Sequence, residues 1–472
     1  MTARRPLLPA VAPGIAAALA VAVFAAAVVA GKGDAMAFEY AAGVVAALGA
    51  AAILLSLRPA WTISLGLALA MFNSHWGNIG VGIPVDRIVL ATGVLSTVLR
   101  EWSASRDSLR TRPIDWLLGA TVLYVVVSAI IVGTIGRHDA QFALLDRFGV
   151  VPFLLFFVAP VAFREERDRR VLLGVLFAMA AYLGITAVLE TVHARGLIFP
   201  RYINDPNVGI HYGRARGPFA EAAGNGLVLY GCGVAAAVAF VTWRGRAARG
   251  FALAMMLLCA LGTLLTLTRA AWLSAIVATV ITLLFARETR RFVVPVLVAG
   301  AATVLLAFAA IPGLEHKAIS REKNQYPLWD RRNSNAAALR MVAARPLVGF
   351  GWGKFTESSL PYYRQSQDYP LTIISNVHNV YLANATELGI IGAALWLVSL
   401  LLAVGRGVFR RGPPELRPWR LGLLALWISY AVVAFTTPLG FALPTMLLWT
   451  WAGVTWSDIR RTGAWAAVPR PI

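Results

Sequence analysis

Long apolar stretches separated by short polar connections run along the whole chain. Many of them are about 17 to 25 residues long, the length that a helix needs to cross a hydrocarbon core. The clearest are residues 8–30, 114–133, 171–192, 226–242, 251–268, 292–311, 380–405 and 421–436. Shorter or weaker ones are residues 41–57, 60–72, 88–99, 150–163, 270–286 and 443–456. The pattern predicts an all-α polytopic membrane protein with twelve to fourteen transmembrane helices, the first of them a retained helix and not a cleaved signal.

The connections differ in their arginine content, and this difference indicates the orientation of the helices. Short cytoplasmic loops carry an excess of Arg and Lys. With the N-terminus inside, the arginine-rich connections all fall on the same side: residues 100–112, 164–170, 243–250, 287–291, 406–420 and the tail from residue 457. We therefore expect both termini to be cytoplasmic.

The overall charge changes this picture little. The chain is 58% hydrophobic and 14% charged, with a formal net charge of +20. Because the charge is scattered over many short loops, it is mostly a topology signal and an attraction to anionic membrane lipids. Nucleic-acid binding is disfavoured for the same reason.

Two connections on the predicted external side, residues 194–224 and 312–377, hold more cations than topology requires. In the longer one, residues 334–345 begin with a serine and stop before a proline, with Leu339 and Val342 on one face. They are predicted as a short amphipathic helix on the membrane surface.

These loops suggest three regions along the chain. Residues 1–190 form N-terminal transmembrane helices, residues 191–405 form a region that holds both external loops, and residues 406–472 form C-terminal helices and a cytoplasmic tail.

Arg269 and His378 are the first candidates for chemistry. Arg269 has apolar residues on both sides, so it either marks a tight external turn and reaches the headgroups, or points a guanidinium suited to phosphate into a cavity. His378 stands where a polar loop becomes an apolar helix, so it is either a helix cap or a proton-transfer group. Glu387 lies deeper in that helix, and we expect it to have a structural role.

Aromatic residues interleave with glycines in residues 349–355, around Trp352. Such aromatics either form an interfacial belt or stack on sugar rings. Metal chemistry has no support, since the chain has no DxD, HExxH or paired CxxC motif, and Cys232 and Cys259 lie inside apolar runs. We therefore expect no metal site and no cofactor.

Four segments resemble the O-antigen ligase and O-antigen polymerase superfamily, which comprises multi-pass glycosyltransferases related in fold to the GT-C class. They occur in the family's order, each at the predicted external face, and the resemblance covers roughly residues 190–405. The segments are GRARGPFAEAAGNG (residues 213–226), LTLTRAAWLS (265–274), RPLVGFGWGKF (345–355) and NVHNVYLANATELGIIG (376–392).

The resemblance implies a glycan donor on a polyprenyl diphosphate and an acceptor hydroxyl on a lipid or glycan, at the outer face of the bacterial cytoplasmic membrane. By position, Arg216, Arg269 and His378 match the family's functional residues. Arginines can neutralise a diphosphate without a metal, and an imidazole can deprotonate the acceptor. This chemistry predicts a metal-independent, inverting transfer. The expected substrate-binding residues are Arg214, Arg340, Arg345, Lys354, Asn379, Tyr381 and Trp352.

Three functions remain open at this point. The single dominant external loop favours a ligase that attaches a finished glycan to a lipid. A polymerase joining repeat units of a polysaccharide is the alternative within the same family. A transporter or flippase of polyprenyl-linked glycans is the alternative of another class, and it would be expected to show internal repeats.

Overall fold

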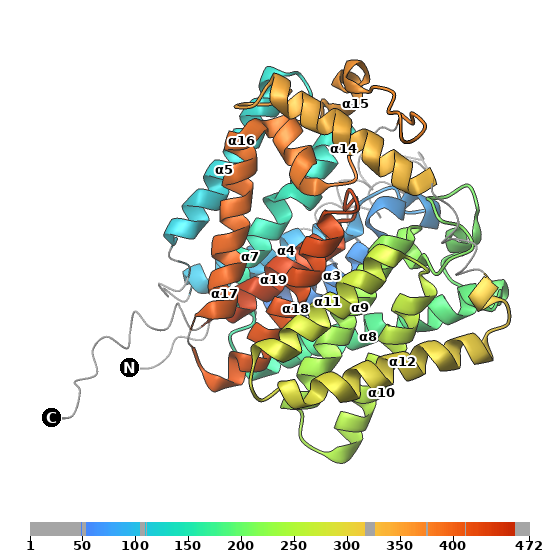
Figure 1. Cartoon of the computed structure of the whole chain (residues 1–472). Helices are drawn as coiled ribbons and strands as arrows, with labels where there is room; N and C mark the ends of the chain where they lie inside the picture. Colours follow the sequence, from blue (N-terminus) through green and yellow to red (C-terminus); the bar gives the residue numbers. More distant parts are fainter. Residues whose placement is uncertain are drawn as a thin grey trace, which may run out of the picture.

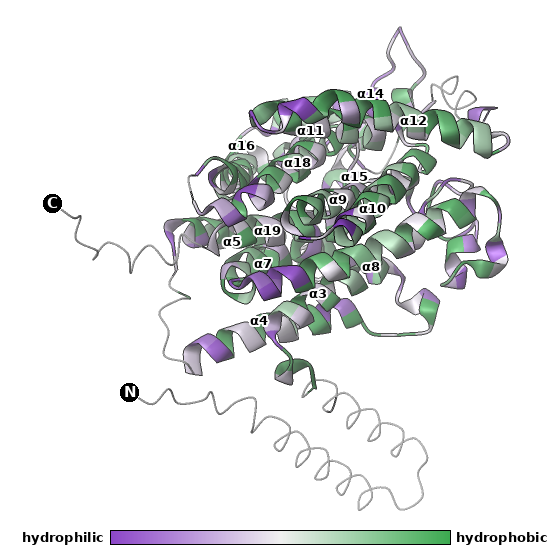
Figure 2. Ribbon diagram, turned by 90° about the horizontal axis from the view of Figure 1, so that it is seen from below, coloured by the Kyte–Doolittle hydropathy of each residue, from purple (hydrophilic) through white to green (hydrophobic). Residues whose placement is uncertain are grey.

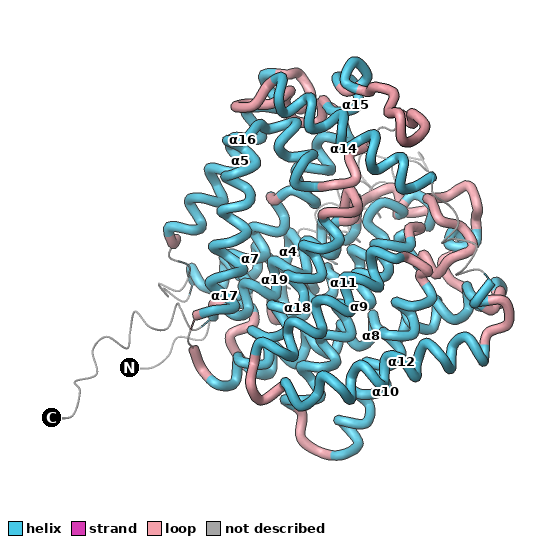
Figure 3. The backbone as a smooth tube through the Cα atoms, in the orientation of Figure 1, coloured by secondary structure: helices cyan, strands magenta, loops and turns pink. Residues whose placement is uncertain are grey.

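The computed structural model describes residues 49, 53–103, 109, 111–316, 326–373, 376–410 and 412–457. In this part of the chain the regular structure is entirely helical (Figure 3). The larger helices of the first half are α3 (Pro59–Leu69), α4 (Val85–Ser103), α5 (Pro113–Ile131), α7 (Val150–Ala162), α8 (Glu166–Thr191), α9 (Ala222–Thr242) and α10 (Arg246–Leu265). Those of the second half are α11 (Arg269–Phe285), α12 (Val293–Ala310), α14 (Tyr326–Ala344), α16 (Val380–Leu400), α18 (Arg417–Ala434) and α19 (Ala442–Thr455). The shorter helices include α6 (His138–Phe142), α15 (Phe355–Ser358), α17 (Arg406–Phe409) and the π-helical turns η4 (Ala143–Phe148) and η10 (Leu401–Gly405).

The apolar pattern predicted these helices closely. Seven helical segments in the described residues are long and apolar enough to cross a membrane, and they are Pro113–Ile131, His138–Ala162, Glu166–Thr191, Ala222–Thr242, Arg246–Leu265, Arg290–Ala310 and Val380–Phe409. The predicted all-α polytopic membrane fold is therefore confirmed. Figure 2 shows largely apolar residues along α8, α10 and α12, with hydrophilic residues at helix ends and in loops.

The predicted number of spans stays a prediction. Helix α11 is apolar but shorter than a full span. Helices α3, α4, α18 and α19 coincide with predicted spans, but they are not among the seven segments that are long and apolar enough to cross a membrane. The predicted spans at residues 8–30 and, for the most part, 41–57 lie outside the described residues, as does the tail after residue 457.

Helix α19 forms the centre of the bundle. All of its residues are buried, and it packs against α7, α9 and α18. Gly453 makes the contact with α7 possible, since an added Cβ would lie 2.7 Å from the carbonyl oxygen of Phe156. Helix α12 lies at the outside of the bundle. Only 6% of the apolar stretch in the segment Arg290–Ala310 is buried inside the protein, as expected for a helix that faces lipid.

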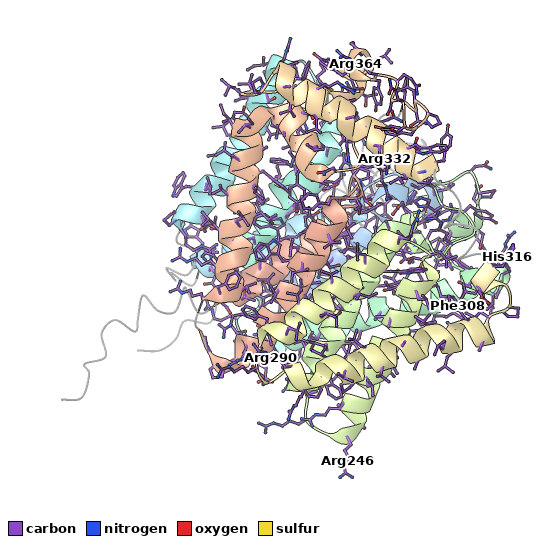
Figure 4. All side chains as sticks on the ribbon, viewed as in Figure 1. Arg246, Arg290, Phe308, His316, Arg332 and Arg364 are labelled. Atoms are coloured by element: carbon purple, nitrogen blue, oxygen red, sulfur yellow. The ribbon has the colours of Figure 1, made fainter. Side chains whose placement is uncertain are left out.

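The polar loops separate into two ends of the bundle. In Figure 4, Arg246 and Arg290 lie at one end, whereas Arg332 and Arg364 lie at the opposite end. The first two belong to connections predicted as cytoplasmic and the other two to the long loop predicted as external. Their separation agrees with the alternation of loops along the sequence, while the side of the membrane that each end faces remains a prediction.

Helix α14 is longer than predicted. It begins at Tyr326 and not at Ser334, and it runs across one end of the bundle (Figure 1). Ser334 is buried inside the helix, where its Oγ donates to the carbonyl of Arg331 at 3.3 Å.

Candidate active site

A cluster of polar side chains lies where α9, α11 and α16 begin. The three helices start after Glu221, Thr268 and Asn379, and the Glu221 and Asn379 side chains accept hydrogen bonds from backbone N–H groups of the first turn. Helix α14 packs against α16 at the same end. Helix N-termini attract anions, because their free N–H groups and macrodipoles point at the ligand.

His378 lies directly before the N-cap of α16. Its Nδ1 is buried and has no hydrogen-bond partner. Burial lowers the pKa of the imidazole, and the positive charge of Arg331 lowers this pKa further. An imidazole whose pKa is lowered and whose Nδ1 has no partner is suited to accept a proton.

Arg331 and Arg269 supply the positive charge of the cluster. Arg331 Nε is buried without a partner, and burial together with the nearby charge of Arg269 lowers the pKa of Arg331. Arg269 is exposed at the first position of α11, which follows Leu267 in a left-handed conformation (φ 47°). Two guanidinium groups that repel each other would be stabilised by an anion between them.

His211 and Glu221 approach the cluster from the loop before α9. The charge of His211 acts on His378, and His211 Nδ1 lies 3.2 Å from Glu221 Oε1 without a hydrogen-bond geometry. The other oxygen of Glu221 accepts from Gly224 N at 2.6 Å. Glu221 therefore caps the start of α9 and lies beside His211.

Arg216 has a different environment from the one that the sequence suggested. It is 1% exposed, and its guanidinium donates to the carbonyls of Ile203 at 2.9 Å and Val208 at 2.6 Å, beneath the ring of Tyr212. Its side chain thus holds the loop of residues 203–216 together. Direct contact of Arg216 with a diphosphate would require the loss of these bonds.

Arg214 lines a small pocket beside Arg216. Its Nε is buried without a partner. The pocket is also lined by Glu190, whose carboxylate accepts from the backbone N–H groups of Arg216 and Gly217.

The glycine-rich segment of residues 346–355 is docked into a break in α16. Gly389 interrupts that helix with φ 67° and ψ −177°. Backbone bonds join Phe350 N to Thr386 O at 3.0 Å and Ile390 N to Pro346 O at 2.8 Å. A Cβ on Gly389 would lie 2.1 Å from the carbonyl oxygen of Leu347. Two of the resembling segments are therefore halves of a single packed unit.

Trp352 and Lys354 have their partners within this end of the fold. Trp352 is 6% exposed and donates from Nε1 to Ala140 O at 3.0 Å. Lys354 pairs with Glu357 at 2.5 Å. A sugar could not stack on Trp352 without moving it out of its buried position.

Arg340 and Arg345 also contact their own loop. Arg340 Nη1 donates to the carbonyl of Tyr362 at 2.8 Å, while Arg345 is exposed over the ring of Phe350 at 4.9 Å.

Asn379 and Tyr381 frame the start of α16. Asn379 Oδ1 accepts from Leu382 N at 3.1 Å, so Asn379 is the cap and His378 is not. Tyr381 packs against Phe435 and Trp396, with ring centroids 4.5 and 5.8 Å apart.

The structure thus places Arg331 near both His378 and Arg269, and adds Asp330 and His211 near His378. No feature of the sequence separates Arg331 from the other arginines of the long loop, since only the fold of α14 carries it to His378. Asp330 was missed for the same reason, and one of its carboxylate oxygens is buried without a partner. In the described residues no group of three His, Cys, Asp or Glu is arranged to hold a metal ion.

Comparison with known proteins agrees with the resemblance. No curated protein matches the chain. The sequence model of the O-Antigen ligase family matches residues 254–397, a segment that contains Arg269, Arg331 and His378. The match indicates a membrane glycosyltransferase of the ligase or polymerase type. The match at residues 254–397 supports the O-antigen ligase superfamily as the family of this multi-pass membrane protein.

Proposed function

We propose that the protein transfers a glycan from a polyprenyl diphosphate carrier to an acceptor hydroxyl at the outer face of the bacterial cytoplasmic membrane. The carrying observation is the imidazole of His378, whose Nδ1 has no partner, near Arg331, which in turn lies near Arg269. The cluster combines a proton acceptor with fixed positive charge, which are the two requirements of this reaction.

Arg269 and Arg331 bind the diphosphate in this proposal. Their planar guanidinium groups suit phosphate oxygens, and they offset the charge that develops on the leaving group. Because the arginines carry this charge, the transfer needs no metal ion.

His378 takes the proton of the acceptor hydroxyl through its free Nδ1. The acceptor oxygen forms a bond to the anomeric carbon as the bond from that carbon to the diphosphate oxygen breaks. Polyprenyl diphosphate leaves with the electron pair, and the proton passes from His378 to water. Attack from the face opposite the leaving group inverts the anomeric carbon.

The roles expected for Arg214 and Arg216 change within this proposal. Arg216 holds the loop that carries His211, and Arg214 lines its pocket, so both act by positioning the loop. Arg340, Arg345, Lys354 and Trp352 likewise shape the long loop, while Asn379 and Tyr381 set the start of α16.

A transfer assay with purified protein tests the proposal. The donor is a polyprenyl-diphosphate glycan in detergent with a chelator present, and release of polyprenyl diphosphate is measured for wild type, His378→Ala, Arg269→Ala and Arg331→Ala. Arg364→Ala is the control, because Arg364 is an exposed cation of the same loop with no contact to the cluster among the described residues. Only wild type and the control should turn over. Equal turnover by His378→Ala would overturn the assignment.

The product distinguishes a ligase from a polymerase. We favour the ligase, in which a single finished glycan moves to a lipid acceptor. A ladder of products that grows by one repeat unit would instead assign polymerisation to the same site.

A further inference from the structure

Arg147 lies within a segment long enough to span the membrane. The proposed chemistry does not use this arginine. It lies in the π-helical turn η4, inside the segment His138–Ala162. Its Nε is buried without a hydrogen-bond partner, and its guanidinium lies 5.9 Å from the centroid of the Phe142 ring. The residue is mostly buried, and a part of its surface is exposed.

The acidic neighbours of Arg147 have other partners, although Oδ1 of Asp146 is buried without one. Asp146 accepts from Arg87 Nε at 3.0 Å and Arg87 Nη2 at 2.5 Å. Glu387 accepts from two backbone N–H groups, and Asp139 pairs with Arg137 at 3.0 Å. Although these charges act on Arg147, none of them lies within 4.0 Å of its guanidinium in the described part of the chain.

An arginine without a partner at this depth is unfavourable for the protein alone. A buried donor without an acceptor costs free energy, and charges inside membrane spans ordinarily pair or face a cavity. Gly440 is the neighbour on one side, where an added Cβ would lie in contact with Arg147 Nη1 at 4.0 Å. Because no acidic side chain of the described residues pairs with Arg147, an anion from outside these residues would satisfy it.

We propose that Arg147 binds a phosphate group carried by a membrane lipid, at a site separate from Arg269 and Arg331. A guanidinium binds phosphate oxygens through a planar pair of N–H donors. Because Arg147 belongs to a membrane-spanning segment, a lipid brings the anion to it more readily than bulk solvent does. Two lipids carry such a phosphate, the polyprenyl-diphosphate donor and an anionic phospholipid. Binding of the donor at Arg147 rests on the proposed function, whereas binding of a phospholipid does not.

Substitutions at Arg147 and Arg87 separate a ligand-binding arginine from a structural one. Arg147→Gln removes an unpaired charge, so the ligand-free protein should unfold at a temperature no lower than wild type. Arg87→Gln is the matched control, because it leaves the fully buried Asp146 without its partner and should lower the unfolding temperature.

Gly440 offers a second pair of variants. Gly440→Asp places a carboxylate within reach of Arg147 and should occupy it, whereas Gly440→Asn has nearly the same size and no charge. Gly440 does not have a positive φ, so both side chains fit its backbone.

The experiment measures unfolding temperature in detergent against added polyprenyl diphosphate, phosphatidylglycerol and diacylglycerol, which lacks phosphate. Wild type and Gly440→Asn should be stabilised by at least one of the two phosphate lipids and not by diacylglycerol. Arg147→Gln and Gly440→Asp should bind that lipid at least about tenfold more weakly. The lipid whose effect is lost identifies the source of the phosphate.

Two results would overturn the inference. One is a ligand-free Arg147→Gln protein as destabilised as Arg87→Gln, and the other is an unchanged lipid response in both Arg147→Gln and Gly440→Asp. Because binding is measured without turnover, a wild-type protein that transfers no glycan would overturn the proposed function and leave this inference standing.

Discussion

Glu387 Oε2 accepts a hydrogen bond from the backbone N–H of Gly353 at 3.0 Å. Its other carboxylate oxygen accepts from Phe355 N at 3.1 Å, and its carbonyl accepts from Gly351 N at 2.8 Å. Through these bonds α16, which begins next to His378, is tied to the segment that follows α14. The distance between Arg331 on α14 and His378 therefore depends on Glu387, which contacts neither of them.

Glu387→Ala should weaken both the fold and the transfer. It leaves two backbone N–H groups without acceptors, which costs about 2–4 kcal/mol in total, and it should reduce turnover by at least about tenfold by loosening α14. Unfolding temperature and transfer rate in detergent measure the two effects. Glu357→Gln is the control, since Glu357 is an exposed partner of Lys354 in the same loop. If Glu387→Ala has the unfolding temperature and the transfer rate of wild type, Glu387 does not hold α16 to the segment that follows α14.

Gly389→Ala should be more damaging than an ordinary glycine substitution. The backbone at Gly389 has a positive φ, and the new Cβ would meet the carbonyl of Leu347 at 2.1 Å. We expect loss of folded protein or a marked fall in unfolding temperature. Gly119→Ala makes the matched comparison, because nothing lies within 4 Å of its Cβ in the helix α5, where alanine is favourable by about 1 kcal/mol. Equal behaviour of the two variants would show that the break in α16 is not required.

The pH dependence of transfer should follow His378. A base acts in its neutral form, so the rate falls as the pH drops through its pKa, which burial and Arg331 hold below the usual histidine value. Arg331→Gln removes a positive charge and should raise this pKa, which moves the acidic limb of the residual activity to higher pH. Initial rates between about pH 4 and 8 span the usual range of histidine. A limb that stays in place would indicate a different base.

Arg269→Lys should already cripple turnover, although it keeps the charge. A lysine is a point charge that cannot make the two parallel hydrogen bonds of a guanidinium. Because Arg269 is exposed, the unfolding temperature should change little. Steady-state transfer kinetics with full activity in Arg269→Lys would remove Arg269 from the diphosphate site.

Arg216→Gln should act on stability as well as on activity. The buried guanidinium donates hydrogen bonds to several backbone carbonyls. Loss of these hydrogen bonds should lower the free energy of unfolding by about 2–4 kcal/mol. We expect a lower unfolding temperature and easier proteolysis in residues 203–216. If the variant instead keeps wild-type stability and loses only donor affinity, Arg216 contacts the substrate directly, as its position in the sequence first suggested.

The sequence determined the elements of this protein with little help from tertiary structure. Apolar runs long enough for a membrane set the helices, because backbone groups in lipid must bond within the helix. Thus the run at residues 114–133 became α5 (Pro113–Ile131), and the run at residues 292–311 became α12 (Val293–Ala310). Arginine-rich connections likewise divided the loops between two ends.

The local motifs singled out His378 and Arg269, which the structure places near the same arginine, Arg331, while their part in the chemistry stays a prediction. The motif around Arg216 did not reveal the role of this arginine. The sequence Arg-Gly-Pro-Phe is the same whether the arginine contacts a substrate or the carbonyls of its own loop.

Only the tertiary structure decided which distant residues meet. Arg331 reaches His378 because α14 lies across the end of the bundle, and the glycines of residues 349–353 are needed because that segment enters the break at Gly389. These contacts join segments tens of residues apart, and their formation depends on how helices pack and on which backbone groups remain to be bonded. Neither quantity is a property of a local stretch of sequence.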